Sequence, residues 1–395
     1  MKTRKVVIVN QATKYLTIAI ANEFQKKCDK VALITGSIEE QGEKLDPSIV
    51  VSFTSNFSRK VGKIKMLLLW LFLLFQVFYK LLFKFKDFEV VFIPNPPIAS
   101  WVMLLLPHRF SIINWDVYPD GLKIMGIKES NLIFKVWVWI NRKLFSKSYQ
   151  IITRGNNIAS LLSKYVDSNK ISIALIWSNF GKFTAIPKSE NLFLHENNVE
   201  GKFIIQYSGN IGLAHNVEVL LDVAERMQED SNFSFQIIGD GNQKEFISRK
   251  LTDMSLTNCK LFPFQDDFMF KHSLSAADVG VVVLDDLISR VAVPSKIYNI
   301  MNMGIPILYI GSAESELKVY ADSFENGRCF HKTQISEICD FLMELRSNKL
   351  LYKAMSQNSL SALKMFTRDN AEVLVRNYLN NTIVNKVTYS LQPTN

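Results

Sequence analysis

Residues 293–308, VPSKIYNIMNMGIPIL, combine residue types that can bind an anion. Pro294 suits the first turn of a helix, whose free backbone N–H groups and positive dipole end attract negative charge. Lys296 falls in the same turn, where an ammonium opposes the helix dipole unless an anion lies beside it. Gly304 is expected to end the helix, and residues 305–310 to return as a buried strand. The segment therefore predicts a phosphate-binding helix start around Lys296.

Three other segments place small or aromatic residues where a predicted strand ends: YSGNIG at 207–212, IIGDG at 237–241 and LFPF at 261–264. Glycine lets a ligand approach the backbone, and an exposed phenyl ring can flank a planar base. A tight turn without a ligand, or a core phenylalanine, would also explain each segment taken alone. The residues singled out are Gly209, Asn210, Gly212, Gly239, Asp240, Gly241 and Phe264.

Short apolar strands alternate with predicted helices along the chain, and helices are expected near residues 217–227, 244–254 and 268–277. This rhythm predicts an α/β fold of two Rossmann-like, doubly wound domains that meet at a linker and a cleft, with ligands at the carboxyl ends of the strands. We expect a first domain over residues 1–182, a linker over 183–201, a second domain over 202–365 and a helical tail over 366–395 that packs back on the first domain.

Composition restricts the classes to which the chain can belong. Its 395 residues are 48% apolar and 21% charged, which excludes a disordered chain and favours two domains. Residues 1–182 hold 26 Lys and Arg against 12 Asp and Glu, so the net charge of +9 originates in the first half. The four cysteines have neither disulfide nor zinc-ligand spacing, so we expect a reducing cytosol and no metal. The apolar run VVIV near the start predicts a strand and not a signal peptide.

Residues 47–86 contain no acid and include the apolar run MLLLWLFLLFQVFY. As a helix this run would be about 21 Å long, short of the roughly 30 Å that a membrane-spanning helix must cross. Its flanking and interrupting polar residues share one stripe of the helix: Lys65, Gln76, Lys80 and Lys84. We therefore expect Met66 to Phe85 to lie in the interface of an anionic membrane, with lysines toward lipid phosphates. A core helix is the alternative, and the aromatics lie in too apolar a run for a nucleic-acid surface.

Together, YSGNIG, IIGDG, AADVGVVVL and PSKIYNIMNMGIPI resemble the nucleotide-sugar domain of retaining glycosyltransferases of family 4, over roughly residues 202–311. That family has the GT-B fold. In the first half, NWDVYPDGLKIMG at 114–126 is similar to a D-x-(W/Y)-P-(D/E) stretch of the bacterial subgroup that builds O-antigen, capsule and exopolysaccharide.

The resemblance implies roles for particular residues. Lys296, helped by Arg290, would pair with the donor diphosphate. Asp116 and Asp120 would bind sugar hydroxyls or orient the acceptor, although Asp120 also suits a turn before Gly121. The remaining implied donor-binding residues are Gly209, Asn210, Gly212, Gly239, Asp240, Gly241, Phe264, Pro294, Ser295 and Asn299.

The chain departs from the family pattern at three places. Where many members carry two glutamates eight positions apart, this chain has Val291 and Asn299. Asn299 can still hydrogen-bond a ribose hydroxyl, but Val291 cannot replace a carboxylate. The loop after the first strand lacks the usual glycines, and Trp115-Asp116 stands where many members have a His-Asp pair.

These observations predict a membrane-associated retaining glycosyltransferase on the cytoplasmic face of a bacterial inner membrane. Its donor would be a nucleotide sugar, with a UDP-sugar expected, and its acceptor a polyprenyl-diphosphate-linked saccharide. No metal, cofactor or nucleic acid is expected, and the lack of a nucleophile motif agrees with a family thought to form no covalent intermediate. The alternatives are an enzyme like UDP-N-acetylglucosamine 2-epimerase and a non-catalytic partner subunit that keeps the fold.

Overall fold

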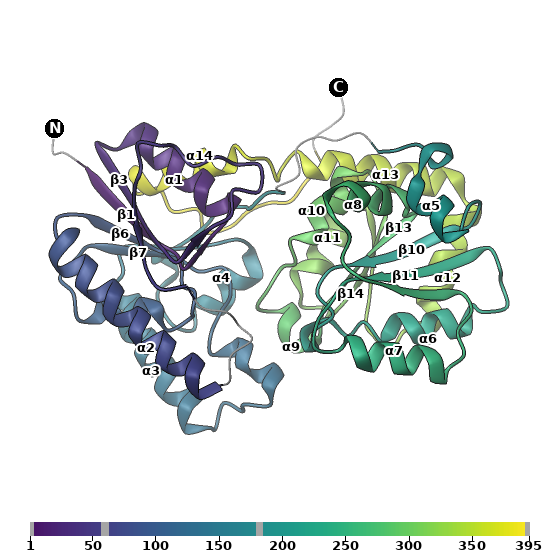
Figure 1. The fold of residues 1–395 in the computed structure, drawn as a ribbon, viewed down its shortest axis with the longest axis horizontal. Coiled ribbons are helices and arrows are strands. Elements are labelled where there is room, and N and C mark those ends of the chain that lie inside the picture. The colour runs from purple at the N-terminus through teal and green to yellow at the C-terminus, as the bar shows by residue number, and fades with distance from the viewer. Residues whose placement is uncertain (1–3, 57–62, 179–184, 392–395) are drawn as a thin grey trace. The chain divides into compact units, whose positions relative to one another are not determined.

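The computed structural model describes residues 4–56, 63–178 and 185–391, which form two compact units (Figure 1). Unit 1 comprises Met1–Asn179 and Thr367–Val387, and unit 2 comprises Phe180–Phe366 and Thr388–Asn395. The expected border between the first domain and the linker, at residues 182 and 183, lies outside the described residues.

Unit 1 is built on a seven-stranded parallel sheet in the order β5-β3-β1-β6-β7-β8-β9. Its strands are β1 (Lys5–Val9), β3 (Lys30–Thr35), β5 (Val50–Phe53), β6 (Glu89–Phe92), β7 (Phe110–Ile113), β8 (Ile151–Thr153) and β9 (Ile171–Ile173), with a small separate pair, β2 (Ala12–Thr13) and β4 (Ser37–Ile38). Its helices are α1 (Tyr15–Lys27), α2 (Lys63–Tyr79), α3 (Leu132–Lys147), α4 (Asn156–Leu162) and α14 (Asn370–Leu379), with 3-10 turns η2 (Ala99–Leu104) and η3 (Asp120–Met125).

Unit 2 has a six-stranded parallel sheet in the order β12-β11-β10-β13-β14-β15. Its strands are β10 (Phe203–Ser208), β11 (Phe233–Ile238), β12 (Cys259–Phe262), β13 (Val279–Val283), β14 (Ile307–Ile310) and β15 (Gly327–Phe330). Its helices are α5 (Leu192–Asn197), α6 (Val219–Arg226), α7 (Lys244–Asp253), α8 (Asp267–Ala276), α9 (Asp286–Ser289), α10 (Lys296–Asn302), α11 (Glu316–Phe324), α12 (Ile335–Ser347) and α13 (Lys349–Leu363).

These strand orders confirm the predicted fold class of two doubly wound α/β units. In each sheet the chain starts near the middle, winds to one edge and then returns to wind to the other edge. The order reverses between β1 and β6 in unit 1 and between β10 and β13 in unit 2. Ligands of such sheets bind beyond the carboxyl ends of the strands at this reversal, so it is where a site is expected in each unit.

The segment around Lys296 differs slightly from the expected helix start. Helix α10 begins at Lys296 and has Ser295 as its N-cap, so Pro294 precedes the helix instead of lying in its first turn. Gly304 follows the helix end with a positive φ of 63°, as a helix-terminating glycine should. The helix has only seven residues, so its dipole attracts an anion weakly. Binding of an anion here therefore depends mainly on the Lys296 side chain.

The described part of the predicted linker, residues 185–201, belongs to unit 2 instead of joining two domains as a free segment. Helix α5 packs Phe193 and Leu194 into a core cluster with Ile238 of β11. Lys188 Nζ lies 2.6 Å from both carboxylate oxygens of Asp278. The sequence analysis did not predict this helix. Its six residues make less than two full turns, which is too short for a helical pattern of apolar residues to repeat.

Helix α2 is longer than the sequence analysis expected. It runs from Lys63 to Tyr79 and continues through a π-helical turn at Lys80–Lys84. Among the described residues, Lys65–Lys84 is the one helical stretch long and apolar enough to cross a membrane by length and composition, with a mean hydropathy of 2.1. One side of it is nevertheless buried in unit 1, through Leu73, Val77 and Leu81.

The polar stripe of α2 does not face outward as a whole, which corrects the expectation for these residues. Gln76 accepts a hydrogen bond from the backbone N–H of Ser55 at 2.9 Å. Lys80 donates to the hydroxyl of Ser52 at 2.8 Å. Two of the four stripe residues therefore fix the helix to the edge strand β5 and to the chain just after it, and of the four only Lys65 and Lys84 are exposed.

The tail returns to unit 1 through α14, which packs on α1. The Phe24 and Tyr378 rings meet edge to face at 5.3 Å. Arg368 pairs with buried Glu23 and, at 2.7 Å, with Glu43. After α14 the chain passes to unit 2, where buried Tyr389 donates a hydrogen bond to Glu316. Residues 392–395, the end of the predicted tail, lie outside the described residues.

Candidate functional site

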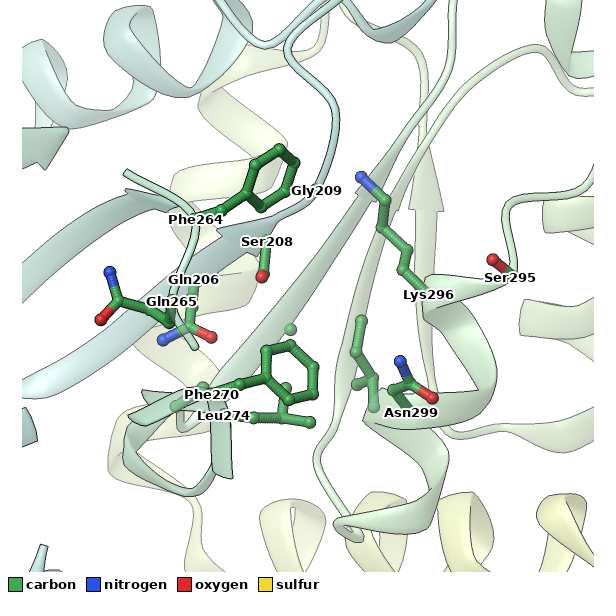
Figure 2. Close-up of a pocket in the computed structure, with 13 residues that line it drawn as sticks. Gln206, Ser208, Gly209, Phe264, Gln265, Phe270, Leu274, Ser295, Lys296 and Asn299 are labelled. Atoms are coloured by element: carbon green, nitrogen blue, oxygen red, sulfur yellow. The ribbon is translucent and has the colours of Figure 1, made fainter. Parts of the chain in front are cut away.

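A cavity of about 250 Å³ lies in unit 2 at the reversal point between β10 and β13 (Figure 2). Figure 2 shows Phe264 on one side and two residues of α10, Lys296 and Asn299, on the other. Its lining residues are Gln206, Ser208, Gly209, Phe264, Gln265, Phe270, Leu274, Ala277, Gly280, Ser295, Lys296, Asn299 and Ile300. An apolar wall with a few convergent polar groups is typical of a small-molecule site.

Lys296 is the one ionisable side chain among the residues that line this cavity. Its Nζ is buried, has no hydrogen-bond partner within the described residues, and lies 3.6 Å from the centroid of the Tyr207 ring. The Tyr207 hydroxyl donates to the carbonyl of Asn210 at 2.6 Å, which holds the ring in place. Burial lowers the pKa of Lys296 well below its ordinary value.

His215, at the end of a 3-10 turn (Leu213–His215) after β10, is the titratable neighbour of Lys296. Burial, and to a lesser extent the Lys296 charge, lowers the pKa of His215 to about 4. Its Nδ1 is also buried without a hydrogen-bond partner in the described chain. The imidazole is therefore neutral at pH 7 and does not compete with Lys296 for an anion.

Gly209 makes room for the lysine. A Cβ on this residue would lie 2.8 Å from Lys296 Nζ, closer than real Cβ contacts come. Gly239 and Gly241 have a different role, because a Cβ on either would lie within 2.2 Å of a carbonyl oxygen of Gly209 or Ile211. Those two glycines allow the loops after β10 and β11 to touch.

The structure brings five of the predicted site residues together around the cavity: Gly209, Phe264, Ser295, Lys296 and Asn299. It does not bring the other predicted donor-side residues to the lining: Asn210, Gly212, Gly239, Asp240, Gly241, Arg290 and Pro294. Asp240 pairs with Lys244 at 3.8 Å, and Arg290 pairs with Glu314 at 3.1 Å on the surface. Arg290 is therefore engaged by a carboxylate, in place of its expected help to Lys296.

Asp116 and Asp120 lie in unit 1 beyond the carboxyl end of β7. The Asp116 side chain is 64% exposed and accepts a hydrogen bond from Arg154 at 3.0 Å. Asp120 is buried, accepts from the hydroxyl of Tyr165, and pairs with Lys123 at 2.9 Å. Each carboxylate oxygen of Asp120 thus has a partner within unit 1, which gives this residue a structural role there.

The sequence analysis did not identify two residues of the candidate sites, Gln206 in the cavity of unit 2 and Arg154 beside Asp116 in unit 1. Gln206 donates to Gln236 at 3.1 Å and to the carbonyl of Ser273 at 2.7 Å, so a buried polar pair supports the cavity floor. Its signal was a glutamine at the same register in two otherwise apolar strands. Arg154, whose side chain is 11% exposed, follows β8 immediately and carried no spacing signal of its own.

Comparisons with known proteins agree with this geometry. Residues 189–361 match the family model of glycosyl transferases group 1. The chain is 22% identical over 234 residues to a Pseudomonas aeruginosa protein named as a glycosyltransferase, WbjE, covering 58% of each chain. It is 28% identical over 154 residues to WcaI of Escherichia coli, named as a colanic acid biosynthesis glycosyl transferase, covering 38% of this chain and 37% of that one. The matches thus span 58% and 37% of the length of these relatives.

Solved structures share the fold of the whole chain. The Anabaena protein Alr3699/HepE, crystallised with UDP and with UDP-glucose, superposes with TM-scores of 0.70 and 0.72 at 12% identity, covering 95% of this chain and 99% or more of that one. A UDP-N-acetylglucosamine 2-epimerase superposes with a TM-score of 0.57 at 12% identity, covering 96% of this chain and 97% of that chain. At this identity the likeness shows the fold alone. The predicted resemblance is confirmed by the family match over unit 2.

We predict that Gly209→Ala destabilises unit 2 more than Gly201→Ala does. Both glycines have positive φ. The value of 75° at Gly201 lies near the left-handed region that other residues can reach, whereas the value of 148° at Gly209 lies far outside it, so backbone strain adds to the steric contact at Gly209. At Gly201 no heavy atom lies within 4 Å of the added Cβ, whereas at Gly209 the Cβ displaces Lys296. Equilibrium denaturation of both variants checks this, and equal losses would show that Lys296 does not depend on Gly209.

Proposed function

We propose that this chain, whose residues 189–361 form a glycosyl transferases group 1 domain, transfers a sugar from a UDP-sugar to a lipid-linked saccharide acceptor in bacterial surface polysaccharide or lipopolysaccharide synthesis. The observation that carries the proposal is the cavity at the β10–β13 reversal, with a buried amine that lacks a counter-ion. A solved structure with this fold holds UDP and UDP-glucose, which supports the choice of nucleotide.

In this proposal the donor lies along the cavity. Phe264, 57% exposed, flanks the base, Asn299 hydrogen-bonds a ribose hydroxyl, and Lys296 pairs with the diphosphate. Transfer breaks the bond between the sugar C1 and the diphosphate oxygen, forms a bond from C1 to the acceptor oxygen, and passes the hydroxyl proton to the departing diphosphate. Charge builds up on the leaving group as the first bond breaks, so the chief catalytic task is to neutralise it. The proposal assigns that task to Lys296 without a metal.

The acceptor side belongs to unit 1. Asp116 presents an exposed carboxylate that Arg154 fixes in position, so it suits the binding of acceptor or sugar hydroxyls. The exposed faces of α2, η2 and α3 support membrane association. We call this surface the apolar face: Leu67, Leu68, Leu71, Phe72, Phe75, Tyr79, Phe83, Leu105, Leu132, Ile133, Val136 and Trp139. Turn η2 packs against both helices, and Leu105, which follows it, is the exposed apolar residue of this connection.

The apolar face favours a chain that lies in the membrane interface over one that spans it. Leu73, Val77 and Leu81 of the same helix are buried in unit 1, and a spanning helix would have to leave that core. Exposed Lys65, Lys84 and Lys143, the last 3.8 Å from the Trp139 ring centroid, place basic groups for lipid phosphates. The described cysteines are all unpaired, which suits the cytoplasmic leaflet.

The alternatives have less support. The family match over unit 2 favours a transferase over an epimerase, and an epimerase has no need for the apolar face. A non-catalytic partner subunit that binds no ligand would have no use for a buried amine without a partner, because an apolar residue would be more stable in its place.

We predict that Lys296→Ala lowers the affinity for UDP by about 10- to 100-fold, because a charge-assisted contact of roughly 1.5–3 kcal/mol is lost. Lys244→Ala is the matched control, since Lys244 follows the neighbouring strand but pairs with Asp240 outside the cavity lining. Calorimetry with UDP and hydrolysis of UDP-sugars measure both variants. Unchanged UDP binding by Lys296→Ala would contradict the donor site.

We predict that Asp116→Asn lowers turnover and leaves UDP affinity within about threefold, since its partner is the acceptor or the sugar. Asp120→Asn should instead lower the melting temperature, because the amide disturbs buried bonds to Tyr165 and Lys123. A large loss of UDP binding by Asp116→Asn would move this residue to the nucleotide and refute its assigned role.

We predict that replacing Leu68, Leu71, Phe72 and Phe75 with Gln releases the chain from anionic liposomes while the melting temperature is retained. Each exposed side chain gains about 1.5–3 kcal/mol when it is fully buried in the lipid. Phe78, which is partly buried, is left unchanged. Leu350→Gln on α13, also an exposed leucine, is the control and should sediment with lipid like the parent. A quadruple variant that stays folded and still sediments would refute the membrane surface.

A further inference from the structure

The buried amine of Lys296 has no counter-charge in the described chain. Its Nζ makes no hydrogen bond, and its closest favourable contact is the Tyr207 ring at 3.6 Å. A contact between an ammonium and an aromatic ring stabilises the charge by at most about 2 kcal/mol. Removing an ammonium from water costs several kcal/mol even after the protein has relaxed. The cost of desolvation is therefore larger, so burial lowers the pKa of Lys296 and shifts its protonation equilibrium toward the neutral amine while the cavity holds no anion.

The titratable groups nearest to Lys296 do not change this balance. Burial raises the pKa of Tyr207, so the ring keeps its proton and provides no phenolate. His215 is neutral at pH 7 because burial lowers its pKa to about 4. On the packing helices, Lys349 and Lys353 of α13 are exposed, and Asp266 accepts from the backbone N–H of Met269 in α8.

The carboxylates of the neighbouring strand ends have partners of their own. The pairs are Asp240 with Lys244, Asp285 with Lys332, Asp286 with His331, and Glu314 with Arg290. None of these carboxylates contacts Lys296 in the described structure, and burial alone accounts for the lowered pKa of this lysine. An anion that enters the cavity would be the first negative charge in contact with the amine.

We propose that Lys296 is uncharged in the empty cavity and takes a proton from solution when a nucleoside diphosphate binds, so that it selects the diphosphate against the bare nucleoside. This inference rests on the proposed donor site. A nucleoside brings no charge, so the amine stays neutral and adds nothing to its binding. A diphosphate brings the counter-charge, which favours the ammonium form and adds a charge-assisted hydrogen bond.

The proposal fixes the sign of the pH dependence. The bound anion raises the pKa of Lys296 above its value in the empty cavity, so the complex holds one more proton than the free protein between those two values. Affinity for UDP then falls by up to about tenfold per pH unit as the pH rises through this interval. The terminal phosphate of UDP titrates near pH 6, so measurements from about pH 7.5 to 9 isolate the lysine.

The test is calorimetric titration of the full chain with UDP, in buffers of different ionisation enthalpy, beside titration with uridine. The parent should take up close to one proton on binding UDP and none on binding uridine. Lys296→Arg is the matched control, because a guanidinium stays charged, and it should bind UDP without proton uptake. Lys296→Met should lose UDP affinity at least tenfold and keep its uridine affinity. Asn299→Ala should weaken both ligands alike and retain the proton uptake.

The outcomes separate this inference from the proposed function. UDP binding by the parent without proton uptake, combined with weak binding by Lys296→Met, would overturn the inference and leave the donor site standing. Equal proton uptake by the parent and Lys296→Arg would also overturn it, since another group would then carry the proton. A parent chain that binds no UDP would overturn the proposed donor site and this inference with it.

Discussion

The architecture of unit 2 is organised around one unfavourable arrangement, the burial of the Lys296 amine without a counter-charge. The neighbouring structure makes this arrangement possible. Gly209 leaves the space that the Nζ occupies, and the fixed hydroxyl of Tyr207 holds an aromatic face beneath it. Gly239 and Gly241 let the next loop close against the first. A protein that only had to be stable would gain from an apolar residue at position 296, so the arrangement is best understood as preparation for an anionic ligand.

Helix α2 meets two opposed requirements in unit 1. Its inner side completes the core with Leu73, Val77 and Leu81, while its outer side remains as apolar as the inner one. The polar residues Gln76 and Lys80 fix the helix to β5 and to the chain just after it, so the outer side stays exposed without loosening the fold. Solvent exposure of so many large apolar side chains is rare in a soluble monomer, and the proposed contact with lipid would cover them.

Sequence reasoning was most successful where periodicity is long. Helices α6, α7 and α8 lie within about two residues of their expected ranges, and the doubly wound class followed from the alternation of strands and helices. It was less informative where one residue type can serve two purposes. Gly239 and Gly241 suggested close approach of a ligand, and the structure shows that both also allow close approach of a neighbouring loop. Asp120 and Arg290 suggested binding groups, yet each is engaged by partners that lie far along the chain, Tyr165 and Glu314. Such pairings depend on tertiary structure, which local patterns do not encode.

The central claim is that a nucleoside diphosphate lies in the cavity between β10 and β13 with its diphosphate on Lys296. A crystal structure of the chain with UDP tests it most directly. The account predicts a diphosphate oxygen about 3 Å from Lys296 Nζ, with the base beside Phe264. UDP bound elsewhere, or bound in this cavity with its diphosphate out of reach of Lys296, would contradict the account.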